Sequence, residues 1–194
     1  MQMINRCAWP KHELEIAYHD AEWGVPVFDD RVLFEFLTLE GGQAGLSWLT
    51  VLKKREGYRR AFHDFEISRV AKMTDDELAE VLLTGEIVRN RAKVASTRLN
   101  AQKLIDLVAE QGSFANYWWG WTDGQPVNNE FKSMKDLPAK SSLSETISKD
   151  LLKRGFKFVG PTIIYAMAQA TGLVNDHTTD CFRHQECLQL RTQK

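Results

Sequence analysis

Apolar residues recur through most of this chain at spacings of three and four, which is the period of one buried face of an α-helix. Alternation of apolar and polar positions, the pattern of a half-buried strand, is rare. Two segments are apolar on nearly all sides and predict enclosed helices, namely Leu33 to Leu39 and Gln43 to Arg55. The second ends in the basic run Lys53 to Arg55, which we expect to be exposed. The pattern as a whole predicts an all-α fold.

Capping signals set the boundaries of further helices. Thr74 to Glu77 reads T-D-D-E, a capping box whose helix should stop near Gly85. A long helix is expected over Arg89 to Gln111. Ser142 and Glu145 form a second capping box, and the helix that it starts should run directly into a tight turn.

That turn joins two helices in the segment L-L-K-R-G-F-K-F-V-G-P-T. Gly155 and Gly160 permit backbone angles and close approaches that a Cβ would obstruct. Gly160 and Pro161 suit the first positions of the second helix, and Gly172 suits its end. The N–H groups that open a helix lack helical partners and suit a phosphate. The segment at about 143–171 resembles the helix-hairpin-helix that grips DNA backbone in many repair enzymes; the alternative is an ordinary corner between helices.

Side chains of the hairpin strengthen the prediction of an anion site. Lys153, Arg154 and Lys157 place positive charge beside the turn. Phe156 and Phe158 alternate with these charges, and we expect both rings to anchor the turn to the core.

Length and composition narrow the class of protein. The 194 residues predict a single domain spanning 1–194, helical, with two lobes that share a core. A formal net charge of −1 does not by itself indicate a nucleic-acid-binding protein. The chain has neither an apolar run long enough to cross a bilayer nor the apolar region of a signal peptide, so we expect a cytoplasmic protein that binds no membrane. We also expect a monomer. Gly124 to Pro138 predicts a loop.

Two pairs of potential metal ligands lie at opposite ends of the chain. His177 and Cys181 are spaced H-x3-C, and Cys7 and His19 flank a short N-terminal segment. Together they form a Cys2His2 set, which suits tetrahedral Zn2+ in a closed structural site. An odd number of cysteines argues against a disulfide framework. The competing ligands are His12, His184 and Cys187.

A candidate ligand pocket centres on Glu40, which ends an apolar helix and precedes two glycines. A carboxylate at such a position needs donors or a cation, because burying it alone is costly. Tyr18, Trp23 and Trp48 can supply flat surfaces around it, an arrangement that suits a planar cationic ligand. The alternative is a capping or salt-bridging glutamate beside core aromatics.

The chain resembles the 3-methyladenine DNA glycosylase I family, the constitutive bacterial branch of the helix-hairpin-helix repair superfamily. The matching stretches are C-A-W at 7–9, A-Y-H-D-A-E-W-G-V-P at 17–26, L-E-G-G-Q-A-G-L-S-W at 39–48, V-L-K-K-R-E at 51–56, I-V-R-N-R at 87–91, K-R-G-F-K-F-V-G-P-T at 153–162 and G-L-V-N-D-H at 172–177. They occur in order and cover nearly the whole chain.

The resemblance implies a structural Zn2+ and removal of 3-methyladenine from double-stranded alkylated DNA, with the free base as product. It carries the metal ligands onto Cys7, His19, His177 and Cys181. It places the base pocket at Tyr18, Glu40 and Trp48, with Trp9 and Trp23 nearby. It maps the DNA clamp onto Lys153, Arg154, Gly155, Phe156, Lys157, Phe158, Gly160 and Thr162.

The implied mechanism needs little acid catalysis, because a 3-methylated adenine is cationic and already a good leaving group. Glu40 would accept hydrogen bonds from the flipped base and stabilise an oxocarbenium-like sugar. Asp176 is interpreted as a capping residue or a support for His177. Two alternatives stay open at this point: a glycosylase/lyase with Lys153 or Lys157 as the attacking amine, and a non-catalytic DNA-binding module.

Overall fold

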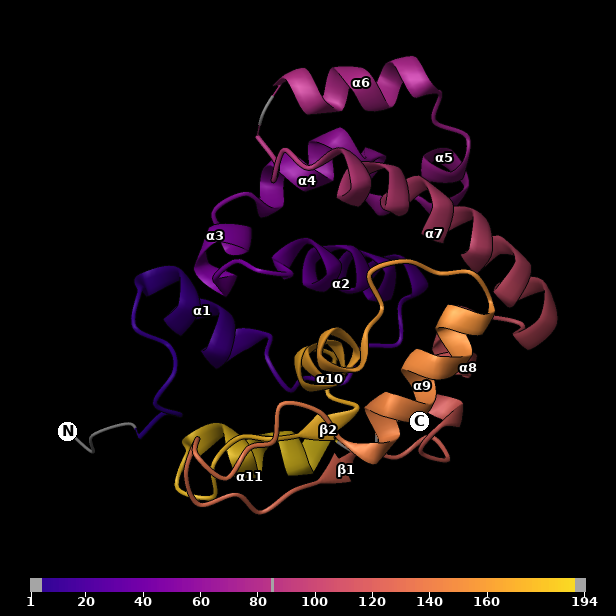
Figure 1. Cartoon of the computed structure of the whole chain (residues 1–194). Coiled ribbons are helices and arrows are strands. Elements are labelled where there is room, and N and C mark those ends of the chain that lie inside the picture. The colour runs from indigo at the N-terminus through magenta and orange to yellow at the C-terminus, as the bar shows by residue number, and fades with distance from the viewer. Residues whose placement is uncertain (1–4, 85, 191–194) are drawn as a thin grey trace.

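The structure is a computed structural model that describes residues 5–84 and 86–190, and it is mostly helical (Figure 1). The first helices are α1 Glu13–Ala21, α2 Asp30–Gln43, α3 Trp48–Leu52, α4 Arg55–Ala61, the 3-10 turn η1 His63–Phe65, α5 Ile67–Ala71 and α6 Asp75–Thr84. The remaining helices are α7 Arg91–Gln111, α8 Phe114–Gly120, α9 Ser142–Lys153, α10 Pro161–Ala170 and α11 Phe182–Gln189. The strands β1 Val127–Asn128 and β2 Val174–Asn175 pair in parallel. No helix in these described ranges is long and apolar enough to span a bilayer.

Helix α2 lies at the centre of the molecule, with α7 on one side and α10 on the other (Figure 1). Asp29 caps it by accepting from the N–H groups of Arg31 and Val32. The predicted apolar segment Leu33 to Leu39 lies inside this helix and is buried on all sides, as expected. Each fully buried leucine or phenylalanine contributes about 1.5–3 kcal/mol, so α2 organises the core.

The enclosed helix predicted over Gln43 to Arg55 is wrong. The chain leaves α2 at Ala44, passes through an exposed loop in which Gly45 has φ +80°, and forms only the short α3 before α4. Leu46 is 42% exposed on that loop. Lys93 pins the loop from α7, since its Nζ donates to the carbonyls of Gly42 at 2.9 Å and Ala44 at 2.7 Å. The apolar residues of this segment therefore have different environments: Val51 is buried in the core, Trp48 lines a cavity and Leu46 is exposed.

The expected exposure of the basic run is correct for Lys53 and wrong for Arg55. Arg55 is only 9% exposed, because its guanidinium donates to Glu35 at 2.6 Å and Glu22 at 2.7 Å. A buried guanidinium requires such partners, and these pairs join α4 to α2 and to the end of α1.

The other boundaries lie close to their predicted positions. Thr74 and Glu77 form the expected capping box, and α6 ends at Thr84; Gly85 lies outside the described residues. Helix α7 begins at Arg91 instead of Arg89 because Asn90 is its N-cap. Two further findings correct details of the prediction. The box at the start of α9 is formed by Ser141 and Ser144 and not by Ser142 and Glu145, and the loop 124–138 contains β1.

Helices α9 and α10 pack against each other and are joined by a turn over residues 154–160 (Figure 1). Gly155 has φ +91°, a backbone angle that a side chain would strain. Gly160 is the N-cap of α10 with Pro161 following, as predicted. Gly172 has φ +70°, and an added Cβ would lie 2.6 Å from the backbone of Val25 and Pro26, so only glycine fits there. That close approach brings the segment after α1 against the end of α10.

Candidate active site and metal centre

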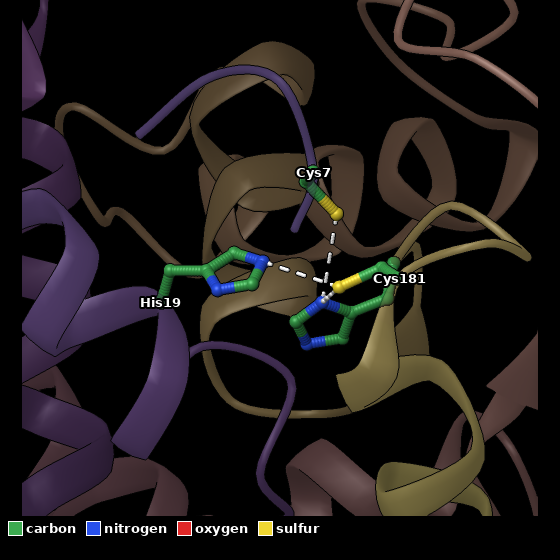
Figure 2. A group of neighbouring side chains, drawn as sticks. Cys7, His19 and Cys181 are labelled. Carbon is green, nitrogen blue, oxygen red and sulfur yellow. Dashed lines mark hydrogen bonds between the residues drawn. The ribbon is translucent and has the colours of Figure 1, made fainter. Parts of the chain in front are cut away.

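The four predicted metal ligands meet in one buried cluster. Cys7, His19, His177 and Cys181 each offer one ligand atom, and these atoms lie within 4.8 Å of one another. Figure 2 shows Cys7, His19 and Cys181 converging on a common point from the N-terminal segment, from α1 and from the start of α11. This buried Cys2His2 group can hold a metal. The competing residues His12, His184 and Cys187 are not part of the cluster.

The separations fit a tetrahedral ion. Cys181 Sγ lies 3.5 Å from His19 Nε2 and 3.6 Å from His177 Nδ1, and Cys7 Sγ lies 3.6 Å from His177 Nδ1. Zinc–sulfur and zinc–nitrogen bonds at tetrahedral angles place sulfur and nitrogen roughly 3.6 Å apart. The pKa of Cys181 is lowered, chiefly because the Cys7 thiol donates a hydrogen bond to its sulfur. One sulfur is thus already stabilised as the thiolate that a metal requires.

Both imidazoles are held by a second contact. His19 Nδ1 donates to Asp20 at 2.8 Å, and Arg6 in turn binds that carboxylate at 2.8–2.9 Å. His177 Nε2 donates to the carbonyl of Trp23 at 2.9 Å. Each contact fixes the proton on the far nitrogen, so that Nε2 of His19 and Nδ1 of His177 are free to ligate.

A cavity of about 260 Å³ opens beside this cluster, between α1, α2, α3 and α10. All five residues predicted for the pocket line it: Trp9, Tyr18, Trp23, Glu40 and Trp48. The aromatic rings stand at angles to one another, with Tyr18 5.2 Å from Trp48 and Trp9 5.4 Å from Trp23 between centroids. The cavity therefore has flat walls suited to a planar ligand.

Glu40 contributes an unusual acid to this cavity. It is only 4% exposed, and no residue in the described part of the chain pairs with its carboxyl group, so burial raises its pKa to about 8. Burial and the nearby Glu40 also raise the pKa of Tyr18 well above its usual value. The Tyr18 hydroxyl and the indole N–H groups of Trp9 and Trp48 are buried without a partner among the described residues. Such groups are costly to leave unpaired, and a ligand can satisfy them.

Two tryptophan rings that line the pocket also contact the histidines of the Cys2His2 cluster. Trp23 lies 4.6 Å from the ring of His177, and Trp9 lies 5.6 Å from the ring of His19, both edge to face. The ligand histidines thus support the aromatic walls directly.

Six lining residues were not predicted, namely Gln43, Met134, Leu137, Pro138, Ala166 and Gln169. Three of them lie in the loop 124–138, which β1 brings back onto β2. Neither the length nor the composition of the loop 124–138 predicted that it would pack back against the cavity. Gln169 and Ala166 lie on α10 four and seven residues before Leu173, and their small or polar side chains on an otherwise apolar helix were a usable signal.

The hairpin residues do not line the pocket and lie on a separate surface. Asn100 of α7 holds the turn by contacting both backbone groups of Lys157 at 2.9 Å. Lys153, Lys157 and Thr162 are exposed. Arg154 instead binds Asp150 at 2.7 Å and Glu110 at 2.6 Å. Its charge is therefore compensated within the protein.

The two hairpin phenylalanines behave differently. Phe156 is 1% exposed and anchors the turn as predicted. Phe158 is only half-buried, has φ +55°, and rests its Cβ against Gly41 of α2. It links the turn to the helix that carries Glu40.

Asp176 does not support His177, contrary to the sequence interpretation. Its carboxylate is 1% exposed and accepts from the hydroxyl of Tyr165, from Gln169 Nε2 at 2.8 Å and from Asn129 Nδ2 at 2.6 Å. It therefore joins α10 to the loop 124–138.

Comparisons with known proteins all point to one family. Residues 9–184 match the methyladenine glycosylase family. The DNA-3-methyladenine glycosylase 1 of Escherichia coli (strain K12) is 44% identical over 179 residues, which cover 92% of this chain and 96% of that protein. A crystal structure of 3-methyladenine DNA glycosylase I has a TM-score of 0.89 at 47% identity and covers 92% of this chain and 98% of its own. The structure of a variant of 3-methyladenine DNA glycosylase I in complex with 3-methyladenine has a TM-score of 0.89 at 36% identity. It covers 92% of this chain and 97% of its own.

Proposed function

The chain belongs to the methyladenine glycosylase family, and we propose from this membership that it acts in base-excision repair. It is a monofunctional DNA-3-methyladenine glycosylase, which hydrolyses the N-glycosidic bond of 3-methyladenine in alkylated DNA. Its partners are alkylated double-stranded DNA and the free base that it releases.

The observation that carries this proposal is a buried acid without a cation. Glu40 lies among aromatic faces in a cavity about the size of one flipped base. Because burial without a counter-charge raises its pKa to about 8, the pocket by itself favours the neutral acid. A cationic planar base supplies the missing charge, and the aromatic faces favour the same cation. Neutral adenine offers no such gain, so the pocket discriminates by charge.

The reaction follows from this arrangement. The target nucleotide leaves the stack and its base enters the cavity. The bond between C1′ and the base breaks with its electron pair going to the base, which neutralises the positive charge of the leaving group. A water oxygen bonds to C1′ and releases a proton to solvent. Glu40, as a carboxylate, stabilises the positive charge that moves from base to sugar.

The assignment of individual roles is part of the proposal. Glu40 is the residue that acts on the reacting base and sugar, and Tyr18 and Trp48 bind the base with Trp9 and Trp23. The unpaired Tyr18 hydroxyl and the two unpaired indole N–H groups support this assignment, since each can meet a polar atom of the ligand.

The DNA backbone is proposed to lie across the turn between α9 and α10, as a helix-hairpin-helix. The N–H groups of Val159, Gly160 and Thr162 donate to no acceptor in the described part of the chain, and they lie at the positive end of α10. Gly155, Phe156 and Phe158 shape the turn, and exposed Lys153 and Lys157 add charge. Arg154 supports the turn through Asp150 rather than contacting phosphate.

The Cys2His2 cluster is proposed to hold one structural Zn2+. Cys7, His19, His177 and Cys181 saturate a tetrahedral ion, so the metal would bind neither water nor substrate. Its contribution is to fix the N-terminal segment against α11 and to support Trp9 and Trp23.

The whole chain is proposed to be a single glycosylase domain. The buried apolar residues of both halves form one cluster, from Cys7 to Cys181, and the family match spans 9–184. The cytoplasmic location and the monomeric state expected from the sequence stay predictions.

One assay separates this function from its two alternatives. Duplex DNA treated with a methylating agent is incubated with the protein, and free bases and strand breaks are measured separately. The proposal expects release of 3-methyladenine without nicking. Nicking would indicate a lyase, although no lysine is among the described residues that line the cavity. Binding without base release would indicate a non-catalytic module.

A further inference from the structure

We propose that Gln169 is a second side chain that reads the flipped base, and that Asp176 positions it by holding its amide in one orientation. The inference rests on the proposed function and names a specificity device within the same pocket. It starts from a lining residue that the reaction described above leaves without a role.

Gln169 stands in the last turn of α10 and forms part of the cavity wall. Its backbone carbonyl accepts from the N–H of Gly24 at 3.0 Å, which ties this turn to the segment that carries Trp23. Its side-chain Nε2 donates to Asp176 at 2.8 Å. The residue is thus fixed at both its backbone and its side chain.

Asp176 determines which way the amide points. A carboxylate only accepts hydrogen bonds, and this one already accepts from Tyr165 and Asn129. A flipped amide would turn the Gln169 oxygen towards this carboxylate and place two acceptors against each other in a buried site. The NH2 group is therefore held on Asp176, and the amide oxygen points the other way.

The amide oxygen is left for a ligand. No donor in the described residues reaches Oε1, and the side chain is half-buried against the open cavity. The pocket thus presents two kinds of acceptor, a carboxyl group at Glu40 and an amide oxygen at Gln169. Unlike Glu40, the amide oxygen is an acceptor at every pH. It fits an edge of the purine that carries N–H groups or positive charge, and it disfavours an edge that presents an acceptor.

The first test is a single substitution with a matched control. Gln169→Met keeps the length of the side chain and removes its hydrogen bonding. Gln102→Met makes the same change in α7, where Gln102 also donates from Nε2, in that case to the carbonyl of Ala71, and is not among the residues that line the cavity. Free 3-methyladenine is titrated against the wild type and both variants, with zinc content and thermal stability measured on the same samples.

We expect Gln169→Met to bind the free base about tenfold more weakly or worse, as a hydrogen bond to a charged group predicts, and Gln102→Met to bind it like the wild type. Binding of undamaged duplex DNA should be the same in all three proteins. If folded Gln169→Met binds the base within about twofold of the wild type, the inference is wrong. A wild type that releases no base from methylated duplex DNA would instead refute the proposed function itself.

The second test asks whether Asp176 acts through Gln169. Asp176→Asn gives the site a partner that can donate, so the Gln169 amide is free to flip and its NH2 group can face the cation. Asp176→Asn alone should weaken binding of the free base by about the same factor as Gln169→Met. Added to Gln169→Met, the Asp176→Asn change should weaken base binding little further. Equal losses in both backgrounds would show that Asp176 acts independently of Gln169 and would overturn the positioning role.

Discussion

At the scale of single residues, the pocket depends on a carboxyl group that the protein leaves uncompensated. Glu35 and Glu40 stand five positions apart on α2 and are both buried. Glu35 accepts from Arg55 and Arg59, at 2.6 and 2.9 Å, whereas Glu40 faces a cavity. One glutamate therefore stabilises the fold, and the other is kept available for a ligand at a cost in stability.

Glu40→Gln should make the protein more stable in alkaline solution. The pKa of Glu40 is raised from 4.5 to about 8, so the folded protein keeps a proton that the unfolded chain releases within that window. The free energy of unfolding of the wild type therefore falls as the pH rises from about 4.5 to 8, on the order of a few kcal/mol. Denaturant unfolding at several pH values measures this difference.

The control is Glu35→Gln in the same helix, which should lower stability because it removes the buried carboxylate that Arg55 and Arg59 share. A Glu40→Gln variant whose stability follows the same pH dependence as the wild type would show that Glu40 has a counter-charge.

Glu40→Gln should also lose affinity for the free base. Gln keeps the size of the side chain and part of its hydrogen bonding but removes the charge, so 3-methyladenine should bind about 10- to 100-fold more weakly. Undamaged duplex DNA should bind as before, because backbone contacts supply most of that affinity. Excision should fall without vanishing. Unchanged affinity for the free base would make Glu40 a structural residue.

At the scale of elements, hydrogen bonds from the interior of the molecule hold the turn between α9 and α10 in place. Ser148 donates to the carbonyl of Val159 at 2.7 Å, and Asn100 holds Lys157 from α7. The outer side stays open, since a Cβ added at Gly160 would meet nothing within 4 Å. A substitution at Gly160 therefore changes the outer surface without disturbing the packing.

Gly160→Val should weaken binding to all duplex DNA alike and leave affinity for the free base unchanged. The added methyl groups would stand where a phosphate must approach the N–H groups of α10. Gly120→Val, at the end of α8, is a suitable control because a Cβ there also meets nothing within 4 Å. Titrations of damaged and undamaged duplexes at several salt concentrations test this, and wild-type binding should weaken as salt rises. Loss confined to damaged DNA would argue against a backbone clamp.

The elements that the sequence predicted well carry local signals. The α9–α10 turn has its glycines and proline, α6 has its capping box, and Leu33 to Leu39 is too apolar to lie anywhere but in the core. The segment from Gln43 to Arg55 was misjudged because its helix is interrupted at Gly45, and its apolar residues divide between the core, the cavity and the surface, which local sequence does not separate. The start of α9 was placed one residue late, since several adjacent serines can cap.

The site was predictable where its residues are chemically distinctive. Four scattered cysteines and histidines, and one glutamate among aromatics, are candidates by their chemistry, and the resemblance of the motifs that contain them selects these residues from the competing ones. Met134 and Gln169 were missed because their place in the cavity depends on the return of a loop and on the close approach at Gly172, both of which are long-range events.

At the scale of the whole molecule, the metal cluster joins the two ends of the chain. Cys7 precedes α1 and Cys181 caps α11, so an ion at their meeting point closes nearly the entire chain into one loop. Closing a long loop removes much of the freedom of the unfolded chain. The same ion would support the pocket through the two histidine rings that contact Trp9 and Trp23.

Purified protein should contain about one Zn2+ per chain, and Cys181→Ala should lose it together with several kcal/mol of stability. Cys187→Ala should keep the metal, since that buried thiol lies outside the cluster. Elemental analysis and thermal unfolding, with and without a chelator, measure both effects. Freshly purified wild-type protein without zinc would contradict the prediction.

The two halves of the cluster are synthesised at different times. A ribosome delivers the chain from its N-terminus, so Cys7 and His19 emerge long before His177 and Cys181. A growing chain holds only two of the four ligands, and any chain that stops short of residue 177 never acquires the others. The four ligands can thus meet only late in synthesis, and a bound ion would mark a polypeptide whose synthesis has passed residue 181.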